Sequence, residues 1–338
     1  MGLRSTYASL LAMASAAAAQ NCPLAFDGRV PAGSTPAFFD TDASPFSTGY
    51  VKGANVNFSQ LVELPTVPPS LFDAADNSLA VEVTIDDKSI FTPTPDNVQV
   101  GFRRAELQID SNNGTDASTT GIKTLHFSVR KDPARPLNTS HEYQLVFLED
   151  ASYSTNQFVL KTGTIDGQPA GQNPDLLVLV ANVNVKPIVN LFNTTFTENV
   201  WHNFGLTLDF TANTTTVLYS TDSTPLSLVN GPVANDVSGQ GQFHFGVLKK
   251  PTGSNLTDVT KQGFQPAGID EGVVYGAIFM EDSTGGCVSL GPDGSKNTTS
   301  TPPATYQPNV GTPATTYRPS ATTPPTNNDN NGDDDPEC

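Results

Sequence analysis

Two glutamates lie in the middle of strand-like segments whose alternate residues are polar. Glu106 belongs to GFRRAEL (101–107) and Glu142 to HEYQLVF (141–147). Hydrolysis of a glycosidic bond needs two carboxyl groups, one held protonated and one ionised. Arg104 stands two residues before Glu106, on the same side of an extended strand, where it would hold a carboxylate ionised. The pair Glu106 and Glu142 is therefore our first candidate for this chemistry.

Strict alternation divides each segment into an apolar and a polar side. In 103–109, Ala105, Leu107 and Ile109 form the apolar side and leave Glu106 on the polar one. The polar sides of the segments collect groups that bind sugar hydroxyls. We predict substrate contacts for Arg104, Gln108, His126, Gln144, Trp201 and His244.

Glu149 is the alternative to Glu142. Alternation places Glu149 and Phe147 with Tyr143 on the apolar side, so Glu149 points inward unless the strand ends or bulges there. Glu82, Asp209 and Glu281 are further rivals.

Plainer interpretations stay open at this point. The polar side of an antiparallel sheet is ordinarily solvated, and Arg104 with Glu106 also suits a structural ion pair. Trp201, the only tryptophan, suits stacking on a sugar ring or sealing the edge of the core.

Other chemistries lack their motifs. The sequence has no G-x-S-x-G elbow, no H-E-x-x-H and no Cys/His cluster with zinc spacing. We expect neither a metal nor a cofactor. A net charge of −17 argues against nucleic acid as a partner, because nothing would neutralise phosphates.

The element pattern predicts an all-β fold. Period-2 runs recur between Gly, Asn, Asp and Pro clusters, and helical periodicity is nearly absent. We predict a β-jelly-roll, a two-sheet antiparallel sandwich with an open polar cleft. Its ten strands are 79–86, 100–109, 123–130, 142–149, 157–164, 176–185, 202–210, 215–221, 242–249 and 272–281.

Both ends of the chain differ from the predicted domain at 20–290. Residues 1–19 read as a secretory signal peptide, with small residues before Gln20. Residues 291–338 are rich in Pro, Thr, Ser and Asn and predict a disordered tail. No later run is long and apolar enough to span a membrane, so we expect a secreted, extracellular protein. We also expect it to be a monomer.

Cysteines and sequons agree with export. Cys22 and Cys287 would pair and tie the start of the domain to its end, leaving Cys338 over. Seven N-x-[S/T] sequons offer glycosylation sites: Asn57, Asn113, Asn138, Asn193, Asn213, Asn255 and Asn297.

Several separated motifs resemble glycoside hydrolase family 131, a group of fungal secreted β-glucanases. They are FDGRVP (26–31), LPTVPPSLFD (64–73), VEVTIDDKSIF (81–91), GFRRAEL (101–107), HEYQLVFLED (141–150), STNQFVLKTGT (154–164) and WHNFGLTLDF (201–210). The resemblance covers about residues 22–290.

The resemblance implies a jelly-roll with an open cleft and hydrolysis of β-1,3, β-1,6 and β-1,4 glucans with inversion. It also implies two catalytic glutamates, of which the first corresponds to Glu106. We place the second at Glu142, with Glu149 as the alternative. A non-catalytic glucan-binding protein is the competing hypothesis. A polysaccharide lyase is a weaker one, because a face with two carboxylates suits an anionic polymer poorly.

Overall fold

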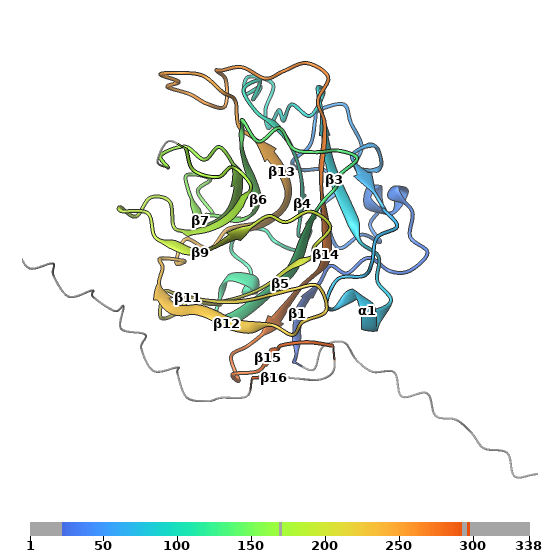
Figure 1. Ribbon diagram of the computed structural model, residues 1–338, viewed down its shortest axis with the longest axis vertical. Helices are drawn as coiled ribbons and strands as arrows, with labels where there is room; N and C mark the ends of the chain where they lie inside the picture. The colour runs from blue at the N-terminus through green and yellow to red at the C-terminus, as the bar shows by residue number, and fades with distance from the viewer. Residues whose placement is uncertain (1–21, 169–170, 293–295, 298–338) are drawn as a thin grey trace, which may run out of the picture. The chain divides into compact units, whose positions relative to one another are not determined.

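The protein is a sandwich of two antiparallel β-sheets (Figure 1). The computed structural model describes residues 22–168, 171–292 and 296–297. The eight-stranded sheet has the order β12 (Ser227–Ala234), β11 (Thr214–Thr221), β10 (His202–Asp209), β5 (Ile122–Lys131), β14 (Asp270–Asp282), β3 (Val81–Asp86) and β2 (Val62–Glu63), with β1 (Leu24–Asp27) paired to β14. The six-stranded sheet has the order β4 (Arg103–Gln108), β13 (Gln242–Lys249), β6 (Glu142–Glu149), β7 (Asn156–Gly163), β8 (Leu176–Ala181) and β9 (Asn190–Thr195).

The remaining elements are short. The two-residue strands β15 (Val288–Ser289) and β16 (Lys296–Asn297) pair with each other. Among the described residues the α-helix is α1 (Asp73–Asp76), and 3-10 turns cover Pro36–Asp40, Phe58–Gln60 and Ala117–Thr119. No helix of the described part has the length and apolar character needed to cross a membrane.

The predicted all-β class is confirmed, and each of the ten predicted segments contains a strand. The two longest strands missed are β9 and β12, which stand at the edges of their sheets. β9 (NLFNTT) is polar and β12 (SLVNGPVA) contains Gly and Pro. Edge strands tolerate such residues because one side of their backbone needs no partner strand, so their sequences lack the usual period-2 signal.

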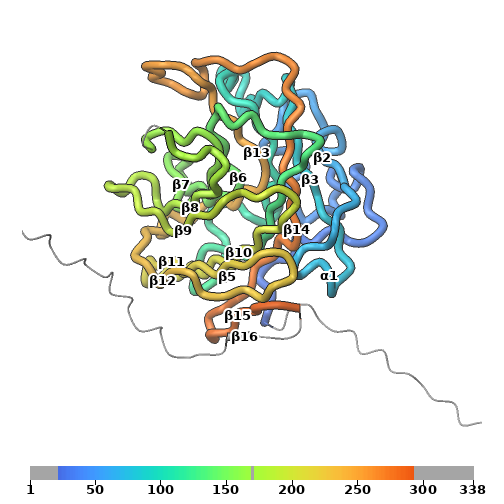
Figure 2. The backbone as a smooth tube through the Cα atoms, in the orientation of Figure 1, coloured from blue at the N-terminus to red at the C-terminus, as the bar shows by residue number. Residues whose placement is uncertain are grey.

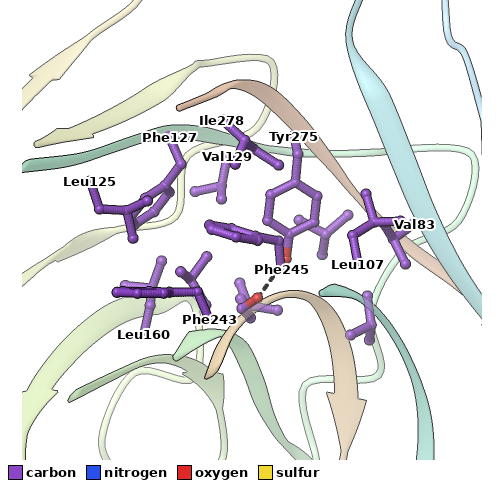
Figure 3. Close-up of a cluster of buried hydrophobic side chains, with 14 of the residues drawn as sticks. Val83, Leu107, Leu125, Phe127, Val129, Leu160, Phe243, Phe245, Tyr275 and Ile278 are labelled. Carbon is purple, nitrogen blue, oxygen red and sulfur yellow. Dashed lines mark hydrogen bonds between the residues drawn. The ribbon is translucent and has the colours of Figure 1, made fainter. Parts of the chain in front are cut away.

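The core lies between the sheets and is rich in phenylalanine. Phe127 from β5 stacks on Phe204 from β10, with ring centroids 5.1 Å apart, and meets Phe245 of the opposite sheet edge-on. Figure 3 shows side chains of β3, β4, β5, β7, β13 and β14 meeting in this layer. The hydroxyl of Tyr275 donates to the carbonyl oxygens of Gly246 and Leu145, which satisfies its polar group in the apolar interior.

A disulfide joins the beginning of the domain to its end. Cys22 and Cys287 are bonded, as predicted, across 265 residues of sequence. Figure 2 shows the blue start of the described chain close to the orange strands β15 and β16. Cross-linking a loop of this length restricts the unfolded chain and, in the chain-entropy model, contributes about 5–6 kcal/mol to stability.

A bulge in β6 overturns part of the predicted alternation. The pairing of β6 with β7 shifts between Gln144 and Val146, and both Leu145 and Val146 face the core. One extra residue reverses the two faces of the strand beyond it. Phe147 therefore leaves the main core for the outer face, which corrects its predicted inward position. Glu149 follows it outward.

Candidate active site

A cavity of about 690 Å³ opens on the outer face of the six-stranded sheet, over β4, β13 and the end of β6. Its floor carries side chains of the sheet, and its walls are loops. The lining includes Arg104, Gln108, Gln242, His244 and Glu149 from the strands. The loops contribute Ser47, Tyr50, Val51, Phe91, Pro93, Asn97, Gln99, Ile109, Asp110, Asn112, Asn113 and Tyr153.

The irregular segments around residues 47–51 and 89 form one wall by bonding to the free edge of β4. The amide of Glu106 donates to the carbonyl of Val51, and the amide of Arg104 to that of Ser89. The amide of Ser47 donates to the carbonyl of Gln108. These bonds satisfy the edge of the sheet and fix the wall relative to the side chains of β4.

Glu106 lies beneath this cavity as a buried carboxylate. Its side chain is 0% exposed, and Arg104 donates to both of its oxygens, at 2.7 Å each. The Nδ1 of His244 lies 2.8 Å from Oε2 of Glu106. Burial alone would raise the pKa of Glu106, but Arg104 and His244 together outweigh it and hold that pKa below its usual value. Glu106 is therefore ionised.

His244 connects this carboxylate to the cavity. An ionised carboxylate only accepts hydrogen bonds, so Nδ1 of His244 carries the proton of the bond to Glu106. In the neutral ring the lone pair then belongs to Nε2, which has no hydrogen-bond partner among the described residues. The ring stacks on Phe147, with centroids 4.5 Å apart and planes 9° apart, which fixes its orientation.

Glu149 is the second carboxyl group of the site, and it reaches the cavity. Its side chain is 24% exposed, and Oε2 lies 3.6 Å from Nε2 of His244. Burial is the largest influence on the pKa of Glu149 and raises it, while His244 and Arg104 lower it by less. One ionised and one protonation-prone carboxyl group thus lie on the two sides of one imidazole ring, an arrangement suited to acid–base chemistry.

The structure brings together five of the residues singled out in the sequence. Arg104, Gln108, His244 and Glu149 line one cavity, with Glu106 directly beneath Arg104 and His244. Their catalytic and binding roles stay predictions.

Glu142 and Gln144 share the outer face of β6 but do not line this cavity. Oε1 of Glu142 lies 2.8 Å from Nζ of Lys161 and 2.7 Å from Nζ of Lys250. Burial raises the pKa of Glu142, but the two lysines outweigh it and keep that pKa below its usual value. The oxygen of Gln144 accepts a hydrogen bond from Asn156.

His126 and Trp201 lie in the eight-stranded sheet, away from the cavity. His126 is fully buried and its Nε2 lies 3.0 Å from Oε2 of Glu281. Trp201 is 1% exposed, and its indole N–H donates to the carbonyl of Pro68 while the ring packs on Ala80 and Val274. The predicted substrate contacts of these two residues do not fit their positions, because alternation alone cannot tell which polar faces other segments cover.

The cavity residues that sequence reasoning missed lie mostly in loops. Tyr50, Phe91, Gln99 and Tyr153 belong to segments without period-2 alternation, so nothing in the sequence assigns them a face. Phe91 supports the site through Arg104, whose guanidinium carbon lies 5.4 Å from the ring centroid. Among the described residues no three His, Cys, Asp or Glu side chains are grouped so as to hold a metal ion.

Comparison with known proteins gives consistent results. The family described as glycoside hydrolase 131 catalytic N-terminal domain matches residues 24–286. The crystal structure of a GH131 β-glucanase catalytic domain from Podospora anserina superposes with a TM-score of 0.61 at 23% identity, covering 80% of this chain and 99% of that one. The GH131 catalytic domain from Coprinopsis cinerea gives 0.58 at 24% identity, covering 80% and 97%. No curated protein sequence matches the chain.

Proposed function

The chain belongs to the glycoside hydrolase 131 family, and from this premise we propose that it hydrolyses β-glucans with Glu149 as the general acid. The observation that carries the proposal is the pair of carboxyl groups on either side of His244. Their surroundings shift the two pKa values in opposite directions, lowering that of Glu106 and raising that of Glu149. Such a division is what an acid–base glycosidase requires.

In the proposed reaction, Glu149 donates its proton to the oxygen of the scissile glycosidic bond. Water attacks the anomeric carbon as that bond breaks, and Nε2 of His244 accepts the proton that the water loses. Glu106 acts through His244: it holds the proton on Nδ1 and stabilises the imidazolium that forms. Arg104 keeps Glu106 ionised throughout, through its two hydrogen bonds.

We further propose that the reaction inverts the anomeric carbon and accepts β-1,3, β-1,6 and β-1,4 linkages, as the family resemblance implies. In inverting enzymes the two carboxyl groups stand roughly 6.5–9.5 Å apart and leave room for water. Oε2 of Glu149 lies 3.6 Å from Nε2 of His244, the proposed base, so inversion requires the side chain of Glu149 to move away from the ring when substrate enters. Glu149, at the last position of β6 and partly exposed, is the group free to adjust when substrate enters.

We also propose that the protein is secreted and glycosylated. The disulfide suits an oxidising compartment. Five sequon asparagines are exposed: Asn57, Asn113, Asn138, Asn193 and Asn255. Asn213 is half-buried and accepts a hydrogen bond from the amide of Val237, which makes it a poorer acceptor. The side chain of Asn297 lies outside the described residues.

The test is Glu149→Gln, which preserves size and removes the acid. We expect release of reducing sugar from soluble β-glucan to fall by about 10³-fold, within the range for a positioned general acid, with the melting temperature unchanged. Glu198→Gln, at an exposed glutamate outside the cavity, is the matched control and should retain full activity. Proton NMR of the first product anomer tests inversion. Full activity in Glu149→Gln would overturn the assignment, and binding without any product from the wild type would favour the glucan-binding alternative.

A further inference from the structure

Exposed aromatic rings gather at the cavity. Among the described residues three large aromatic side chains are exposed: Tyr50 at 64%, Tyr153 at 67% and Phe264 at 63%. Tyr50 and Tyr153 both line the cavity that holds Glu149, whereas Phe264 does not. A ligand bound in the cavity would cover the rings of Tyr50 and Tyr153 and remove their apolar area from water.

The backbone at the same two places is unusual. Nine non-glycine residues of the described chain have a positive φ, and five of them are Asn or Asp, which tolerate that conformation. The other four are Val51 (φ 57°), Tyr153 (φ 58°), Gln240 and Ala277, and of these Val51 and Tyr153, the β-branched and the aromatic residue, line the cavity. A β-branched or aromatic residue in the left-handed region costs free energy, and such residues cluster at functional sites.

Surrounding contacts hold both strained positions in place. The side chain of Val51 is buried, and its carbonyl oxygen accepts a hydrogen bond from the amide of Glu106 at 2.9 Å. This bond fixes the neighbouring Tyr50 relative to β4. The amide of Tyr153 donates to the carbonyl of Asp150 at 2.9 Å.

The carboxylate of Asp150 braces the rest of the loop that carries Tyr153. It accepts hydrogen bonds from the amides of Ser154 and Thr155 and from the hydroxyls of Ser152 and Ser154. Asp150 directly follows Glu149, so the loop and the acid are positioned together.

We propose that Tyr50 and Tyr153 are stacking platforms that bind glucosyl units of the glucan beside the bond cleaved at Glu149. A β-linked glucose ring carries its hydroxyl groups equatorially and exposes C–H groups on both faces, which pack on the face of a phenol ring. This assignment gives the two tyrosines the stacking role predicted from sequence for Trp201. It rests on the proposed β-glucan specificity of the same site.

The experiment measures binding without turnover. In a Glu149→Gln background, a β-1,3-linked and a β-1,4-linked glucose hexamer are titrated by calorimetry against Tyr50→Ala, Tyr153→Gly and Tyr153→Phe. We expect Kd to rise about tenfold for each variant that loses its ring, and to stay within about twofold for Tyr153→Phe. Phe264→Ala removes an equally exposed ring outside the cavity and should leave Kd unchanged.

Stability provides a second readout. Glycine adopts a positive φ without strain, so Tyr153→Gly should keep or raise the melting temperature while it weakens binding. A merely structural tyrosine would lose stability and keep its affinity. The proposal is overturned if Tyr50→Ala and Tyr153→Gly both bind the hexamers as tightly as Phe264→Ala does. It is also overturned if the Glu149→Gln parent binds neither hexamer.

Hydrolysis by the wild type is measured separately. If the wild type releases no sugar while the ring-loss variants still bind more weakly, the platforms stand and the proposed hydrolysis fails. If the wild type hydrolyses glucan and the ring-loss variants bind normally, the platforms fail alone.

Discussion

The two sheets each carry a histidine paired with a glutamate on the outer face, and the pairs differ in what lies beyond the ring. His126 of the eight-stranded sheet contacts Glu281 at 3.0 Å and stacks on Phe279 with centroids 4.5 Å apart. His244 of the six-stranded sheet contacts Glu106 at 2.8 Å and stacks on Phe147 at the same centroid distance. In sequence the two histidines also look alike, in LHF (125–127) and FHF (243–245).

The first pair is sealed and the second opens on a cavity. Phe72 packs edge-on against His126, and the amide of Ser289 in β15 donates to Glu281, so both side chains are fully buried. Beyond His244 stand Glu149 and a cavity of about 690 Å³. The same constellation thus serves as internal packing in one sheet and as a candidate active site in the other. What decides is whether a neighbouring segment covers it.

Replacing each histidine by asparagine gives the largest expected contrast. His244→Asn removes the proton acceptor of the proposed reaction and should lower kcat/KM on soluble β-glucan by about 10³-fold. His126→Asn leaves the carboxylate of Glu281 buried without its ring partner and should cost roughly 3 kcal/mol of stability. Its folded fraction should keep wild-type activity. Denaturant unfolding and initial rates measure both, and equal losses of activity in the two variants would contradict the distinction.

Glu149 and Glu142, at the two ends of β6, differ in the same way: one carboxyl group faces the cavity and the other is part of a structural ion pair. Glu149 faces the cavity, whereas Glu142 neutralises Lys161 and Lys250 at the other end of the strand. Burial is the largest influence on both pKa values, and only at Glu142 do neighbouring cations overcome it. The charge of the neighbours therefore separates a structural ion pair from a candidate acid.

Glu142→Gln should accordingly act on stability. Two nearly buried ammonium groups lose their counter-charge, so we expect a loss of about 2–4 kcal/mol in the free energy of unfolding. Activity of the folded protein should fall by less than twofold. Adding Lys161→Gln removes one of the unpaired charges, so the double variant should lose less than the sum of the two single losses. A Glu142→Gln protein that is stable but inactive would return Glu142 to the catalytic role first predicted for it.

Much of the fold could be read from the sequence, because period-2 alternation and turn residues are local signals. The same rule correctly placed Ala105 and Leu107 in the core and Glu106 on the opposite face. It failed at Glu149, since a single extra residue at Leu145–Val146 reverses the faces and leaves no mark in composition.

The other misses in the site have a different cause. His126 and Trp201 were placed correctly on polar sides, but long-range packing by segments near Pro68 and Phe72 covers them. Tyr50 and Tyr153 sit in loops, where neither face nor exposure follows from alternation. Coverage and loop conformation depend on contacts distant in sequence, which a local pattern does not contain.

The smallest expected effect separates the two pairs by pH. Burial raises the pKa of Glu281, but His126 and Ser289 outweigh it and hold it below the usual value of 4.5. Glu281 therefore contributes stability that is present above pH 4.5 and is lost as pH falls through its lower folded-state pKa.

Glu281→Gln should remove at most one proton from the uptake that accompanies acid unfolding. This change flattens the acid-side slope of stability by up to about 1.4 kcal/mol per pH unit. The pH dependence of activity comes from a different group, Glu149. Activity should fall as pH rises through the raised pKa of Glu149, because the acid loses its proton. Unfolding free energies and kcat/KM measured across the same buffers test the loss of stability at acid pH and the loss of activity at alkaline pH. If Glu281→Gln moved the alkaline limb of activity as well, the two pairs would be coupled and the comparison between a sealed and an open pair would fail.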